Sequence, residues 1–150
     1  MKETIFINLP VSDLHASTAF YQALGAAKND KFSSEQNSCM TISDTIRVML
    51  LSHERWRDFT DRTIPDAHAS SQMLLCLSEE SREDCAAAVD AAVKAGGTAD
   101  PTPKQGHGFM YGRSYEDPNG HIWEVMWMGE AETKSVTRIP IYTNYICISM

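Results

Sequence analysis

Alternation of apolar and polar residues near the start of the chain predicts a strand, and helical spacing predicts the helix after it. The two faces of this strand carry Ile5, Ile7 and Leu9 on one side and Phe6 and Asn8 on the other. Ser12 or Asp13 then provides an N-cap side chain for a helix, and Gly25 is placed to end that helix.

The rest of the first half predicts mostly β-structure. We expect a loose strand near residues 28–32 and a hairpin that joins residues 39–42 to residues 45–51. Residues 53–60 are predicted to form a short exposed helix.

The second half repeats this order of elements. Residues 71–77 alternate as a strand, and Ser78 or Ser81 is placed to cap a helix that Gly96 ends. Residues 98–104 then predict a short strand that prolines interrupt.

Residues 111–128 predict two strands that a tight turn joins. Asp117, Pro118 and Gly120 suit a type I turn, and a left-handed Gly120 gives a three-residue hairpin with a bulge. On one face, this register pairs Tyr115 with Trp123 and Tyr111 with Trp127. The other face carries Ile122, Glu124, Met126 and Met128, so that one carboxylate stands among apolar neighbours.

These elements predict an α+β fold of two βαβββ modules, at about residues 3–60 and 70–128. We expect a curled mixed sheet with the helices on its convex side, in a single domain of residues 1–128. Residues 129–150 are predicted to be a C-terminal extension. Its apolar part, residues 139–150, is expected to pack on the body or on a partner chain, and a disordered tail is the alternative.

Charge and cysteine usage narrow the setting in which the chain works. A formal charge of −7 over 150 residues disfavours nucleic acid and anionic membranes as partners. No apolar run has membrane-spanning length, and the apolar stretch before Pro10 is too short for a signal peptide. The four cysteines lack zinc-finger spacing. We therefore expect a cytoplasmic protein with free thiols.

One face of each predicted strand mixes apolar and polar side chains. The purely apolar rows should pack beneath the helices, so the mixed rows should turn inward. A mostly apolar hollow with a few polar groups is typical of a site for a small organic molecule. The residues expected to line it are Phe6, Asn8, Arg47, Met49, Gln72 and Glu124.

Glu124 has three interpretations. As a structural residue, it would pair with Arg47 or Ser114 or face water. As a general base, it would be partly desolvated beside an acidic C–H of the substrate. As a metal ligand, it would need partners that the sequence barely offers. We favour a polar pocket residue that can act as a catalytic base.

The histidines offer little chemistry by their spacing. No pair matches a metal-binding motif, so surface or capping roles are expected for each. His107, between two glycines, is the reserve candidate for the site.

Three stretches, residues 6–14, 19–25 and 117–124, carry a resemblance to a known superfamily. They resemble the vicinal oxygen chelate superfamily, which contains glyoxalase I, bleomycin-resistance proteins, extradiol dioxygenases and methylmalonyl-CoA epimerase. The closest branch is that of predicted lactoylglutathione lyases. The resemblance covers about residues 2–128. It implies the paired-module fold and a homodimer in which two subunits share each pocket.

The resemblance also implies positions for a divalent metal. In the metal-dependent members four strands supply the ligands, and the matching positions here are Phe6, Met49, Gln72 and Glu124. Only Gln72 and Glu124 can offer an oxygen ligand, so the implied metal site is incomplete. In the shared pocket, Phe6 and Met49 would come from one subunit and Gln72 and Glu124 from the other.

We therefore expect a glyoxalase/bleomycin-resistance-like protein that binds a small organic molecule. The alternative is a metal-dependent lyase or isomerase of the lactoylglutathione lyase type, in which a carboxylate moves a proton beside a polarised carbonyl. A plain interaction module that uses the apolar tail is a third hypothesis, but it leaves the inward polar row without a role.

Overall fold

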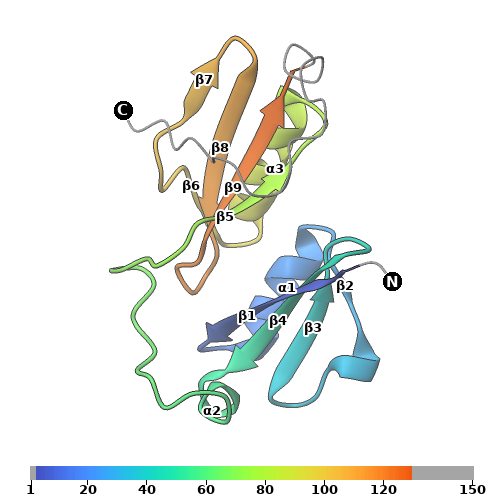
Figure 1. The fold of residues 1–150 in the computed structure, drawn as a ribbon, viewed down its shortest axis with the longest axis vertical. Helices are drawn as coiled ribbons and strands as arrows, with labels where there is room; N and C mark the ends of the chain where they lie inside the picture. The colour runs from blue at the N-terminus through green and yellow to red at the C-terminus, as the bar shows by residue number, and fades with distance from the viewer. Residues whose placement is uncertain (1–2, 130–150) are drawn as a thin grey trace.

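The computed structural model describes residues 3–129. Two sheets are each accompanied by one long helix, and a long connection joins the two halves (Figure 1). The predicted packing of residues 139–150 lies outside the described residues. The domain limits at residue 128 also stay a prediction.

The first module is a four-stranded sheet with the order β1-β4-β3-β2. Strand β1 runs parallel to β4, and the other neighbours are antiparallel. Its elements are β1 (Ile5–Val11), α1 (Leu14–Ala23), β2 (Ala27–Lys28), the 3₁₀ helix η1 (Asp30–Phe32), β3 (Asn37–Thr41), β4 (Ile46–Ser52) and α2 (His53–Trp56). The carboxylate of Asp13 caps α1 by accepting a hydrogen bond from the Ala16 amide at 2.9 Å.

The second module has the same connectivity, with the order β5-β9-β8-β6 and β7 also paired to β8. Its elements are β5 (Leu75–Ser78), α3 (Arg82–Lys94), β6 (Thr98–Ala99), β7 (Gln105–His107), β8 (Met110–Glu116) and β9 (Ile122–Met128). Ser81 caps α3 by accepting a hydrogen bond from the Asp84 amide at 3.0 Å. Apart from the additional strand β7 in the second module, both modules follow the βαβββ order that the sequence predicts.

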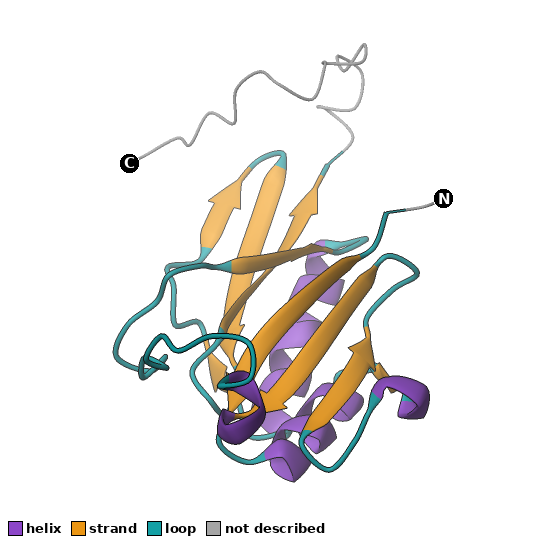
Figure 2. Cartoon of the chain, turned by 60° about the horizontal axis from the view of Figure 1, so that its bottom comes forward, coloured by secondary structure: helices purple, strands orange, loops and turns teal. Residues whose placement is uncertain are grey.

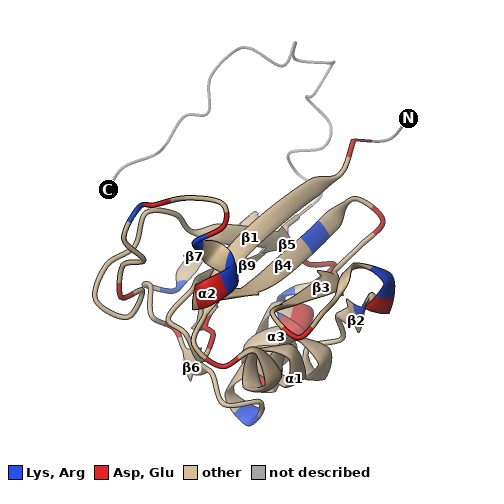
Figure 3. Ribbon diagram, turned by 90° about the horizontal axis from the view of Figure 1, so that it is seen from below, with Lys and Arg blue, Asp and Glu red and all other residues tan. Residues whose placement is uncertain are grey.

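Both sheets lie on one side of the molecule, and α1 and α3 lie together on the other (Figures 2 and 3). One apolar core joins the two halves. On α1, the Phe20 ring lies 6.3 Å from Tyr115 of the second sheet, and the Tyr21 ring lies 6.1 Å from Trp123. The α+β fold of two modules with helices on one face is confirmed. None of the helices in the described part of the chain is long and apolar enough to cross a membrane.

The C-terminal hairpin has the predicted register. Tyr115 is opposite Trp123, and Tyr111 is opposite Trp127. Gly120 has φ 93°, and its amide donates to the Asp117 carbonyl at 3.0 Å, as a type I turn with a bulge requires. Trp123 is 1% exposed and belongs to the core.

Three predicted strands are wrong in extent. Of residues 98–104, only Thr98 and Ala99 form a strand. Residues 28–32 include a 3₁₀ helix because the Asn29 side chain accepts a hydrogen bond from the Lys31 amide and caps a tight turn. Residues 71–77 become a strand only at Leu75. The partner strand β9 begins at Ile122, so the residues before Leu74 have no strand to pair with. Met73 is consequently 59% exposed instead of packing beneath a helix.

Candidate functional site

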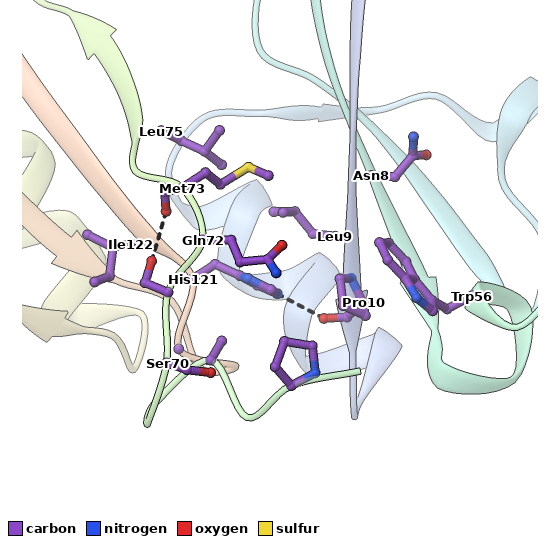
Figure 4. Close-up of a pocket in the computed structure, with 14 residues that line it drawn as sticks. Asn8, Leu9, Pro10, Trp56, Ser70, Gln72, Met73, Leu75, His121 and Ile122 are labelled. Carbon is purple, nitrogen blue, oxygen red and sulfur yellow. Dashed lines mark hydrogen bonds between the residues drawn. The ribbon is translucent and has the colours of Figure 1, made fainter. Parts of the chain in front are cut away.

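A cavity lies where the two modules meet, between the edge strands β1 and β5 (Figure 4). Its volume is about 130 Å³, and it opens to solvent. The connection of residues 57–74 and the turn before β9 complete its wall. Most of the lining is apolar, and the polar residues are Asn8, Ser70, Ser71, Gln72 and His121.

The cavity wraps around the free edge of β1. Asn8 and Trp56 lie on one side of this strand, and Leu9 lies on the other (Figure 4). Side chains alternate along a strand, so Asn8 faces away from the helices while Leu9 points into the core. Gln72 reaches the cavity from the connection and faces β1.

His121 joins the two modules at this cavity. Its Nε2 lies 2.9 Å from the Pro10 carbonyl oxygen. Because a carbonyl only accepts, Nε2 must donate, and Nδ1 of the neutral ring is left as an acceptor. The His121 amide also donates to the Asp117 carboxylate at 3.0 Å.

Three of the predicted site residues lie beside the cavity on the first sheet: Phe6, Arg47 and Met49. Phe6 is the cross-strand neighbour of Arg47, and Asn8 is the neighbour of Met49. Phe6 is 57% exposed. Arg47 turns back to the β3–β4 hairpin, where its Nη1 donates to the carbonyls of Ser43 and Ile46. Its guanidinium thus points along the strand rather than toward the cavity.

Glu124 stands on the second sheet, half-buried and beside Cys76. Within residues 3–129, it makes no hydrogen bond or ion pair with any side chain, so the pairing with Arg47 or Ser114 that one of the three interpretations offered is not formed. The Ser114 hydroxyl instead accepts from the Thr102 hydroxyl at 2.8 Å. Burial raises the pKa of the Cys76 thiol, and the nearby charge of Glu124 raises it further.

The structure therefore divides the predicted residues into three places. Asn8 and Gln72 line the cavity together. Phe6, Arg47 and Met49 lie beside it on the first sheet, and Glu124 lies on the second. Their roles in binding stay predictions.

Trp56 and His121 line the cavity, but they were not predicted to do so. Both stand at the ends of elements, and their places depend on how the modules pack. The signal for His121 was its position directly after the turn of residues 117–120. His107, the reserve candidate, is exposed on β7 and is not part of the lining. Its ring stacks on Phe109 at 6.5 Å.

The residues at the implied metal positions do not fit a metal centre. Phe6 and Met49 carry no nitrogen or oxygen donor. Gln72 lies in a connection instead of on a strand, and Glu124 is not part of the cavity that Gln72 lines. The described residues contain no cluster of three or more His, Cys, Asp or Glu side chains that could hold an ion.

Comparisons with known proteins agree with this fold. A sequence model of the Glyoxalase/Bleomycin resistance protein/Dioxygenase superfamily matches residues 5–125. The chain belongs to this superfamily. No curated protein matches it.

Solved structures share the fold at low sequence identity. A hypothetical protein from S. aureus, SA1046, has a TM-score of 0.71 at 21% identity, over 85% of this chain and 94% of that one. A glyoxalase/bleomycin resistance protein/dioxygenase family enzyme from Burkholderia phytofirmans has a TM-score of 0.69 at 18% identity, over 85% of this chain and 99% of that one. The fosfomycin resistance protein FosX from Listeria monocytogenes has a TM-score of 0.59 at 17% identity, over 85% of this chain and 93% of that one.

Proposed function

We propose that this protein binds a small, largely apolar organic molecule in the cavity between its two modules. The observation that carries the proposal is the lining of that cavity. Leu9, Trp56 and Leu75 give it an apolar wall, while Asn8 and Gln72 add polar groups. Such a wall provides binding energy by burying apolar surface, and the few polar groups orient the ligand.

Membership of the superfamily supports the same proposal. Compared structures from this fold are named for resistance to bleomycin and fosfomycin. Because the identities are low and one fold hosts many activities, the ligand must be argued from this chain's own cavity.

The size of the cavity suggests that one chain supplies only part of the site. Its volume of about 130 Å³ is below the 300–1,000 Å³ that is usual for ligand pockets. The exposed Phe6 beside it offers further apolar surface. A homodimer in which a second copy covers this surface is therefore part of the proposal.

A thermal-shift screen of small organic molecules tests the proposal, with the full chain and two variants. A ligand present at a hundred times its Kd stabilises the folded chain by about 2.7 kcal/mol, which raises Tm by several degrees. We expect Trp56→Ala to remove most of that shift because it deletes one wall of the cavity.

Phe59→Ala is the matched control, because Phe59 is 63% exposed and is not part of the lining. It should keep the full shift. Equal shifts in Trp56→Ala and the parent chain, or no stabilising molecule at all, would contradict the proposal.

The second candidate is a metal-dependent lyase or isomerase of the lactoylglutathione lyase branch. One observation favours it: Glu124 is half-buried and has no partner among the described side chains, as a catalytic base would be. The absence of a nitrogen or oxygen donor on the side chains of Phe6 and Met49 argues against a metal-dependent enzyme. Turnover of the methylglyoxal–glutathione adduct that Glu124→Gln abolishes would favour the lyase over the binding protein.

A further inference from the structure

Residues 60–72, part of the long connection between the modules, form one wall of the cavity. They contain no helix or strand. Connections of this length without secondary structure are uncommon in compact domains and often serve as lids or binding loops. Pro65, Ala67, Ser70, Ser71 and Gln72 of this segment line the cavity.

Packing holds this segment only weakly. None of its residues is buried, and only Thr60, Ile64 and Ala67 are half-buried. Most of its hydrogen bonds are internal, such as those from the amides of His68 and Ser70 to Asp66. A segment with little buried apolar surface opens at low free-energy cost.

One side-chain to side-chain hydrogen bond joins residues 60–72 to the rest of the described chain, and the Ser71 hydroxyl also donates to the adjacent Met73 carbonyl at 2.9 Å. The Nδ1 atom of His68 lies 2.7 Å from Oε1 of Glu116 on β8. Glu116 is the cross-strand neighbour of Ile122, which lines the cavity. The bond therefore fastens the segment at the rim of the cavity.

The backbone of the segment rests on the turn before β9. A Cβ atom at Gly120 would lie 2.5 Å from the His68 nitrogen and 2.6 Å from the Ala67 carbonyl carbon. Only glycine allows this approach, and Gly120 also has φ 93°. The segment thus rests on this turn in addition to its hydrogen bond to Glu116.

We propose that residues 60–72 are a strap that closes the cavity, and that the His68–Glu116 pair is its pH-dependent latch. The strap would regulate the entry of a ligand into the cavity, and this role rests on the proposed ligand-binding function. The closing movement itself does not depend on any ligand.

The groups that face His68 set the direction of the pH dependence. The hydrogen bond to Glu116 raises the pKa of His68 most, and the charges of Glu116 and Asp66 and the backbone of Pro118 add to it, while burial opposes them. The latch therefore contributes its full stabilisation below about pH 6.5, the ordinary pKa of histidine. The contribution is lost as the pH rises through the raised value, so the strap opens more often in alkaline solution.

Hydrogen–deuterium exchange of the full chain tests the strap without a ligand, at about pH 5.5 and about pH 8.5, with rates corrected for intrinsic exchange. We expect protection in residues 60–72 to fall about two- to fivefold between the two conditions, the range that exposed ion pairs support. Protection in α3 should stay unchanged and serves as the check that the fold is intact.

Two variants separate the latch from general effects of charge. Glu116→Gln should lower protection of the strap at the acidic pH and remove its pH dependence, and His68→Gln should do the same. Glu35→Gln, a change at an exposed residue of the first module, should behave like the parent chain. Strap protection that is equal at both pH values, or a pH dependence that survives Glu116→Gln, would overturn the latch. Because no ligand is present, this failure is distinguishable from failure of the binding proposal.

Discussion

The side chain of Asp117, in the second module, is hydrogen-bonded to the first module. It is 1% exposed, and its Oδ2 accepts a hydrogen bond from the Tyr21 hydroxyl of α1 at 2.7 Å. Its Oδ1 accepts from the amides of Asn119 and His121. The Tyr21 hydroxyl in turn accepts from the Trp123 indole at 3.0 Å. A buried carboxylate is tolerated here because three groups donate hydrogen bonds to it.

Tyr21→Phe tests this junction. The change leaves Asp117 without one donor and the Trp123 indole without its acceptor, both in a buried place. Burial and the charge of Asp117 raise the pKa of Tyr21, so its hydroxyl stays protonated and available as a donor. We expect a loss of about 1–3 kcal/mol in the free energy of unfolding, measured by urea denaturation.

Tyr111→Phe is the control for this change. Tyr111 is half-buried, and its hydroxyl makes no hydrogen bond with the other described residues. Its removal should cost less than about 0.5 kcal/mol. Equal losses for the two variants would show that the network around Asp117 does not hold the modules together.

At the scale of elements, local chemistry decided which predictions were confirmed. The hairpin of β8 and β9 was predictable because its turn residues fix both conformation and register. Both helices were predictable because caps and apolar spacing agree. The start of β5 was not, because alternation continues through Gln72 although the partner strand does not. Strand pairing is a long-range property that periodicity cannot show.

The contact between α3 and β8 gives a prediction for elements. A Cβ atom at Gly97 would lie 2.6 Å from the Glu116 carbonyl oxygen and 3.0 Å from the Phe20 ring. Gly97→Ala must therefore push the end of α3 away from the sheet. We expect it to lower the free energy of unfolding by about 1–3 kcal/mol in urea denaturation.

Gly106→Ala provides the comparison for that change. Nothing lies within 4 Å of a Cβ atom at Gly106, on the exposed strand β7. Its effect should stay within about 1 kcal/mol. If Gly97→Ala proved equally mild, the close approach of α3 to β8 would be contradicted.

At the scale of the whole molecule, the sequence predicted the two-module plan but only part of the cavity. Asn8 and Gln72 were expected in the pocket, and they line it. Trp56, His121 and the strap were missed because the packing of one module on the other brings them there. Arg47 and Glu124 were expected to converge with Asn8, but they lie on separate sheets. Alternation along a strand predicts a face, but it does not predict the curvature that decides which faces meet.

The central claim is that the cavity between the modules is a ligand site. A crystallographic fragment screen of the full chain tests it most directly. We predict that bound fragments appear between Leu9, Trp56 and Gln72, with the apolar part of each fragment against Leu9 and Trp56. Fragments that bind only elsewhere on the chain, while this cavity holds nothing but water, would contradict the claim.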